Sequence, residues 1–184
     1  MSIYDKVIDV SSSLSLKGVS YCFGGSIAAI MNGVPLGREP GDIDLIVAEK
    51  DVKKVFGTFS HGKFEGISGD GRIQIVNAWG ARGPSIDIFV AGRHFAPGFD
   101  FGTDVSIERI RGYTFPYASL DYLKKQRDLL IKNVGNRHNA VLRNKTAYDR
   151  TPVKSHFSRI ITDLDQRAPI VKYTDPFSTP PDSP

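Results

Sequence analysis

In the first part of the chain, the spacing of apolar residues changes from segment to segment between the period typical of helices and the period typical of strands. Between residues 2–16, apolar side chains recur every three or four positions, which predicts an amphipathic helix. The mostly apolar, β-prone segment 19–23 predicts a buried strand. Residues 26–32 then predict a short helix with Ser26 as its N-cap, and residues 42–48 predict a second strand.

The pattern continues as a strand-rich region that ends in one clear helix. Loose alternation in 61–67 and 72–77, around a Ser-Gly-Asp-Gly turn, predicts a hairpin, and 85–90 predicts a further strand. Segment 91–112 is irregular, which predicts loops with room for one short element. The other elements expected here are a short helix from its N-cap Asp51 through Phe56, an extended segment at 114–117, and a helix over 120–133 capped by Ser119.

Beyond residue 133 the chain changes character. Residues 139–147 and 155–166 predict further helices, and from residue 168 onward Pro, Ser, Thr and Asp dominate, which predicts disorder. The expected organisation is therefore a core domain at 1–135, a C-terminal helical extension at 136–167 and a disordered tail at 168–184.

Composition narrows the class of protein. The 184 residues carry a formal net charge of +4, and most basic side chains lie in the second half of the chain. Two interpretations fit this distribution: a surface that binds a polyanion, or a solvated helical face. Cys22 is the single cysteine, which excludes a disulfide within the chain and favours a buried structural thiol. No apolar run is typical of a membrane span or signal peptide, so we expect a cytoplasmic protein without a membrane partner.

Two glycines and two aspartates lie at the ends of the first two predicted strands. Gly24 and Gly25 allow a sharp turn, and a helix that starts directly after them would point free N–H groups at a phosphate. Asp42 and Asp44 alternate with apolar residues, so both carboxylates project from the same face of the strand. Paired carboxylates at a strand end are suited to a divalent metal ion.

This layout resembles the nucleotidyltransferase superfamily that includes DNA polymerase β. The resemblance rests on Gly24-Gly25-Ser26, on Asp42-Ile43-Asp44, and on a later strand carboxylate, for which Asp87 is the candidate. The long interval before the acidic pair, with the loop Arg38-Glu39-Pro40-Gly41, is more similar to the antibiotic- and abortive-infection-type members. The resemblance covers roughly residues 19–130. It implies an α+β (α/β) fold with a mixed, largely antiparallel sheet and helices packed on one side.

The same resemblance implies a metal site and its role. Asp42, Asp44 and Asp87 would be the catalytic residues and would bind two Mg²⁺ ions. Asp87 could also assist deprotonation of the acceptor hydroxyl.

The nucleotide would be held by a second set of residues. Gly24, Gly25 and Ser26 would bind the β- and γ-phosphates of a nucleoside triphosphate (NTP), the substrate. Family members usually carry a lysine late in the helix that corresponds to 120–133, where Arg127 stands, with lysines 124, 125 and 132 nearby. The residues expected to balance phosphate charge are therefore Arg38, Lys124 and Arg127. The family's acidic continuation after this helix is absent, and Asn136-Arg137-His138-Asn139 stands there instead.

Three functions fit these observations. The first is transfer of NMP from an NTP to a hydroxyl of a small molecule, a protein side chain or an RNA end, with release of pyrophosphate. The second is a nucleotide- or RNA-binding module of the same fold without transfer activity, favoured by the missing acidic continuation and the basic second half. The third is a toxin- or defence-type nucleotidyltransferase with a cognate partner protein, favoured by the compact single domain.

Overall fold

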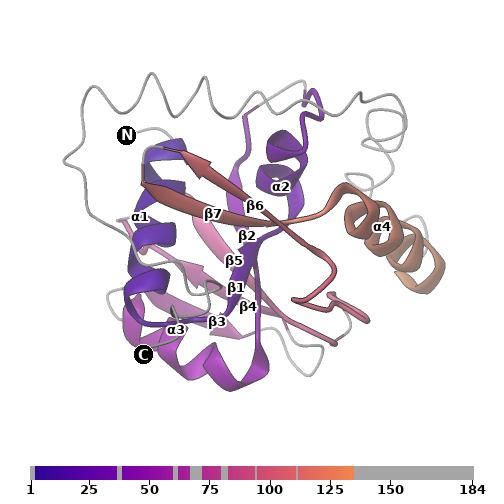
Figure 1. Cartoon of the computed structure of the whole chain (residues 1–184). Helices are drawn as coiled ribbons and strands as arrows, with labels where there is room; N and C mark the ends of the chain where they lie inside the picture. Colours follow the sequence, from indigo (N-terminus) through magenta and orange to yellow (C-terminus); the bar gives the residue numbers. More distant parts are fainter. Residues whose placement is uncertain are drawn as a thin grey trace, which may run out of the picture.

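The computed structural model consists of one sheet with helices on its two faces (Figure 1). The structure describes residues 3–36, 39–59, 62–66, 72–79, 83–93, 95–110 and 112–134. Its elements, in chain order, are α1 (Ile3–Leu16), β1 (Tyr21–Phe23), α2 (Gly25–Met31), β2 (Asp42–Val47), the 3-10 helix η1 (Glu49–Asp51), α3 (Val52–Thr58), β3 (Lys63–Gly66), β4 (Arg72–Val76), β5 (Ser85–Val90), β6 (Val105–Ile110), β7 (Tyr113–Ala118) and α4 (Leu120–Val134).

The sheet has the strand order β3-β4-β5-β2-β1-β7-β6. β2 pairs in parallel with β5, and β1 pairs in parallel with β7, whereas the other neighbouring pairs are antiparallel. The expected mixed, largely antiparallel sheet of an α+β fold is thus confirmed. The order places β2 and β5 side by side near the middle of the sheet, although β3 and β4 come between them in the sequence.

Alternate residues of the central strands face two hydrophobic clusters on opposite sides of the sheet. Tyr21 and Phe23 of β1 belong to the larger cluster, which includes the apolar stripe of α1 and Val55 of α3. Cys22, between them, belongs to the smaller cluster with Tyr122 of α4. The sequence predicts helices on one side of the sheet, and α1 and α3 pack there. A further helix, α4, packs over the opposite face and lies away from α1 in Figure 1.

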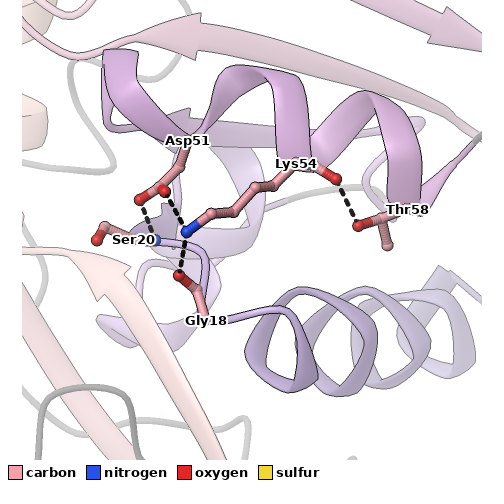
Figure 2. A network of polar contacts seen from close by, with 5 residues as sticks. All are labelled: Gly18, Ser20, Asp51, Lys54 and Thr58. Carbon is pink, nitrogen blue, oxygen red and sulfur yellow. Dashed lines mark hydrogen bonds and ion pairs between the residues drawn. The ribbon is translucent and has the colours of Figure 1, made fainter.

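A buried carboxylate joins α3 to the turn between α1 and β1 (Figure 2). Asp51 accepts hydrogen bonds from the Ser20 backbone N–H at 3.0 Å and from Lys54 Nζ at 2.7 Å, and Lys54 Nζ also donates to the Gly18 carbonyl at 3.2 Å. Asp51 was expected to cap the helix with its side chain, but it makes no such cap bond. That expectation is wrong because the carboxylate is engaged with Ser20 and Lys54.

The hydrogen bonds to Asp51 determine the direction of its pKa. Burial alone would raise the pKa of this carboxyl group, but the hydrogen bonds from Lys54 and Ser20 outweigh that effect and lower the pKa below its ordinary value. The charged form of Asp51 is therefore favoured in the folded protein, and the network in Figure 2 stabilises the fold around neutral pH.

The structure specifies one further expectation and corrects another. The short element for which segment 91–112 had room is a six-residue edge strand, β6, which pairs with β7 along its whole length. Ser26 is not the N-cap of α2, because the helix begins one residue earlier and Gly24 occupies the cap position. The Ser119 cap of α4 is confirmed, since Ser119 Oγ accepts from the Tyr122 N–H at 3.2 Å. The extension at 136–167 and the tail at 168–184 lie outside the described residues.

Candidate active site

Three aspartates from two neighbouring strands meet at one place on the sheet. Asp42 and Asp44 lie on β2, and Asp87 lies on β5 directly opposite Asp44 in the parallel register. One carboxylate oxygen from each residue lies within 4.8 Å of the other two. Asp87 is 3% exposed, whereas Asp42 and Asp44 are half-buried. The three residues that the sequence singled out are thus brought together, and we refer to them as the acidic triad.

The alternation along β2 explains why its two aspartates share a face. Ile43, Leu45 and Val47 are fully buried in the larger cluster, so the side chains between them point to the other face of the sheet. Reversing this orientation would expose three large apolar side chains and bury two charges, which is strongly unfavourable. The core therefore fixes the direction of the Asp42 and Asp44 carboxylates.

The glycine turn lies against Asp44. Gly25 has a φ of +47°, in the left-handed region, and a Cβ placed there would overlap Asp44 Oδ2 and lie 2.6 Å from its Cγ. A Cβ on Gly24 would instead make only ordinary contacts, 3.6 Å from Asp44 Cβ and from Ile46 Cγ1. The Gly24 N–H also donates to the Asp44 carbonyl at 2.8 Å. The start of α2 and the acidic triad are therefore in direct contact, and Gly25 is the glycine that this contact requires.

One polar residue at the acidic triad was missed by the sequence reasoning. Gln74 on β4 lies opposite Asp87 in the antiparallel register, and its Nε2 donates to Asp87 Oδ1 at 2.7 Å. The signal that could have found it is the register of the expected hairpin against strand 85–90, which decides the residue beside Asp87.

The residues expected to balance phosphate charge are placed as follows. Lys124 and Arg127 lie on α4, which packs against α2 through Tyr122, Leu123 and the alanines of α2. Arg127 is buried, and its Nε and Nη2 donate to the Asp128 carboxylate at 3.0 and 2.9 Å. Arg38 lies outside the described residues. A role of Lys124 or Arg127 at the triphosphate stays a prediction.

The thiol and the phenol in the smaller cluster have altered pKa values. Burial, reinforced by the negative charge of Asp104, raises the pKa of the Cys22 thiol well above its usual value. Burial also raises the pKa of Tyr122, with further contributions from Asp104 and Cys22. Both groups remain protonated at neutral pH, so Cys22 is a packing residue rather than a nucleophile.

Comparison with solved structures addresses the fold directly. The lincosamide antibiotic adenylyltransferase LnuA, solved with lincomycin bound, is 15% identical, with 80% of this chain and 94% of that chain covered and a TM-score of 0.54. A nucleotidyltransferase-type protein from Thermotoga maritima is 18% identical, with 80% and 92% covered and a TM-score of 0.51. The chain has a nucleotidyltransferase fold. No family model and no curated protein matches the sequence.

Within this nucleotidyltransferase fold, the donor set of the acidic triad fits a divalent cation. Carboxylate oxygens are the ligands that Mg²⁺, Mn²⁺ and Ca²⁺ prefer, and three of them lie within 4.8 Å of one another. Asp87 is buried, so its charge is weakly screened by water.

Among the described helices, none has the length and apolar character needed to cross a bilayer.

Proposed function

We propose that this protein is a metal-dependent nucleotidyltransferase, which transfers NMP from an NTP to a hydroxyl acceptor and releases pyrophosphate. The observation that carries the proposal is the acidic triad, with its oxygens within 4.8 Å, on a sheet of the nucleotidyltransferase fold. The acceptor would be a small molecule, a protein side chain or an RNA end.

Asp42, Asp44 and Asp87 would hold the divalent ions. Such ions, when bound, supply Lewis-acid stabilisation of the charge that develops on the phosphoryl oxygens. The chain's own contribution is to present the three carboxylates from strands whose other face is packed into the core, so that little rearrangement is needed. Asp87, the most buried of the three, would also accept the proton of the acceptor hydroxyl.

The start of α2 would bind the phosphates. The first N–H groups of a helix have no acceptor within the helix, and they carry partial positive charge. The Gly24 N–H already donates to the Asp44 carbonyl, so the donors proposed here are the N–H groups of Gly25 and Ser26, with the Ser26 hydroxyl. Because Gly25 lies against Asp44, a phosphate bound there would sit next to the acidic triad.

The proposal is tested by incubating the protein with labelled NTPs, Mg²⁺ and a pool of hydroxyl acceptors, and by measuring pyrophosphate release. We expect release with the native protein and at least about a hundredfold less with Asp44→Asn, because even residues that only support a metal ligand contribute about 10- to 100-fold. Asp9→Asn is the matched control, since Asp9 is half exposed on α1, which packs on the opposite face of the sheet.

Two results would count against transfer. NTP binding without pyrophosphate release for any acceptor would favour the binding module of the same fold. Absence of divalent metal binding, measured with Mg²⁺ or Mn²⁺, would overturn the proposal altogether.

A further inference from the structure

The acidic triad has a neighbour on the third strand of this part of the sheet. β4 pairs with β5, and Gln74 lies directly opposite Asp87, which in turn lies opposite Asp44 on β2. Side chains of directly opposed residues project from the same face and have Cβ atoms about 4.5–5.5 Å apart. Gln74, Asp87 and Asp44 therefore form one row across three strands, on the face that carries the triad.

The contact between Gln74 and Asp87 has a defined direction. An ionised carboxylate can only accept hydrogen bonds, so the Gln74 amide must turn its N–H₂ group toward Asp87 and not its oxygen. The Nε2 to Oδ1 distance of 2.7 Å is short for an N–H donor, as is usual when the acceptor is charged. With 3% of its surface exposed, Asp87 is largely removed from water and depends on such donors.

The chemical type of the donor matters as much as its position. A lysine or arginine at residue 74 would also satisfy the Asp87 oxygen, but it would neutralise the charge that a metal ion needs. A glutamine amide holds the carboxylate in place and does not itself neutralise the charge.

We propose that Gln74 is a positioning residue of the metal site: its neutral amide fixes the orientation of the Asp87 carboxylate, so that Asp87 can present an oxygen to a divalent ion shared with Asp44. This inference rests on the proposed function. It assigns no contact between Gln74 and substrate, and its whole effect passes through Asp87.

The test uses the full chain and Mn²⁺ alone, without nucleotide, so that binding and not activity is measured. The Mn²⁺ dissociation constant is obtained from the electron paramagnetic resonance signal of the free ion, and water-proton relaxation reports on the waters that remain on the bound ion. Gln74→Met keeps the side-chain length and removes the donor. We expect it to weaken Mn²⁺ binding about tenfold. We also expect faster water-proton relaxation per bound ion, because a water replaces the Asp87 oxygen.

Three comparisons distinguish positioning from a general structural effect. Gln126→Met is the matched control, because the Gln126 amide donates to the Phe95 carbonyl at 2.5 Å, and this variant should bind Mn²⁺ like the native chain. In an Asp87→Asn background, Gln74→Met should have no further effect on Mn²⁺ affinity. Gln74→Lys, which keeps a donor but adds a positive charge, should bind Mn²⁺ more weakly than Gln74→Met.

The outcomes separate this inference from the proposed function. If the native chain does not bind Mn²⁺, both are overturned. If it binds Mn²⁺ and Gln74→Met binds equally well, or if the loss is the same in the Asp87→Asn background, only the role of Gln74 is overturned. Circular dichroism verifies folding of each variant. Should Gln74→Met not fold, Gln74→Thr carries the same expectation, because threonine is suited to a strand and is too short to reach Asp87.

Discussion

Asp51 and Asp87 are both aspartates with almost no exposed surface, 2% and 3%, but their surroundings are opposite. Asp51 receives a backbone N–H and the ammonium group of Lys54, so its charge is balanced within the chain. Asp87 has the neutral Gln74 amide on one side and two more carboxylates within 4.8 Å. Like charges at that separation repel by about 3–4 kcal/mol per pair at an effective dielectric constant of about 20.

The comparison separates a carboxylate that is bound by an ammonium group from one that lies beside a neutral amide and two further carboxylates. The Asp51 network is complete with the groups shown in Figure 2. The acidic triad places three carboxylates at one point of the sheet, which is the donor set that a divalent cation prefers. Asp51→Asn should therefore act mainly on stability, whereas Asp87→Asn should act mainly on metal binding.

The largest expected effect is on metal affinity. Asp87→Asn removes a charged ligand and should weaken Mn²⁺ binding by about a hundredfold or more, since even an outer partner contributes about 10- to 100-fold. Without metal, the same variant should lose less stability than Asp51→Asn, because the Gln74 amide can also donate to an asparagine oxygen at residue 87. Titration calorimetry with Mn²⁺ and urea unfolding measure the two quantities. An Asp87→Asn chain that is less stable and binds Mn²⁺ normally would show that Asp87 supports the fold and is not a metal ligand.

The two glycines at the start of α2 provide the next largest effect. Gly25→Ala should lower the free energy of unfolding by about 2–4 kcal/mol, because the left-handed backbone disfavours alanine and the new methyl group meets the Asp44 carboxylate. Gly24→Ala is its control and should change stability by less than about 1 kcal/mol, since its Cβ finds ordinary contacts. Urea unfolding of the two variants, each compared with the native chain, measures this difference. Equal losses would show that Gly25 is not specially constrained.

Asp51→Asn should lower the free energy of unfolding by about 1–3 kcal/mol, because Lys54 and the Ser20 N–H lose their charged acceptor. Its Mn²⁺ affinity should not change, because Asp51 lies in the network of Figure 2 and not in the triad. Glu49→Gln is a suitable control, since its ion pair with Arg93 joins two exposed side chains and contributes little. A stable Asp51→Asn chain with altered metal affinity would contradict the comparison.

The smallest effect is on the pH dependence of stability. The pKa of Asp51 is lowered in the folded chain, so its contribution is present above the unfolded pKa of about 3.9 and is lost as the pH falls through the folded value. The difference in unfolding free energy between the native chain and Asp51→Asn should therefore narrow between about pH 5 and pH 2. Urea titrations at several pH values measure this difference in unfolding free energy. A difference that widens as the pH falls would contradict the prediction.

Features encoded in a single segment could be predicted from the sequence. The alternation of Asp42 and Asp44 with Ile43 and Leu45 is visible along one strand and sets their common face. Strand 85–90 was likewise predicted with the bounds that the structure shows. The convergence of Asp87 with this pair was expected from the family resemblance, and the register of β5 against β2 is its physical cause.

Features that depend on pairing between segments could not be predicted. Gln74 becomes a neighbour of Asp87 only through the register of β4 against β5. The short element allowed for in segment 91–112 could not be specified as the strand β6, because Val105 and Ile107 keep an alternation that does not extend to Ile110. The side chain of Asp51 was assigned to a helix cap. Lys54 lies only three residues further on, but the Ser20 N–H is 31 residues away and is brought to Asp51 only by folding.

The contact between Gly25 and the Asp44 carboxylate restricts how this sequence can drift. Every codon change that replaces glycine introduces a Cβ, and at this position the space is already filled by a carboxylate oxygen. Residue 25 therefore has no neutral substitutions while Asp44 keeps its present rotamer, although the adjoining Gly24 can vary. A mutational scan of the chain should show this one glycine as a sharp minimum in tolerance beside a permissive neighbour.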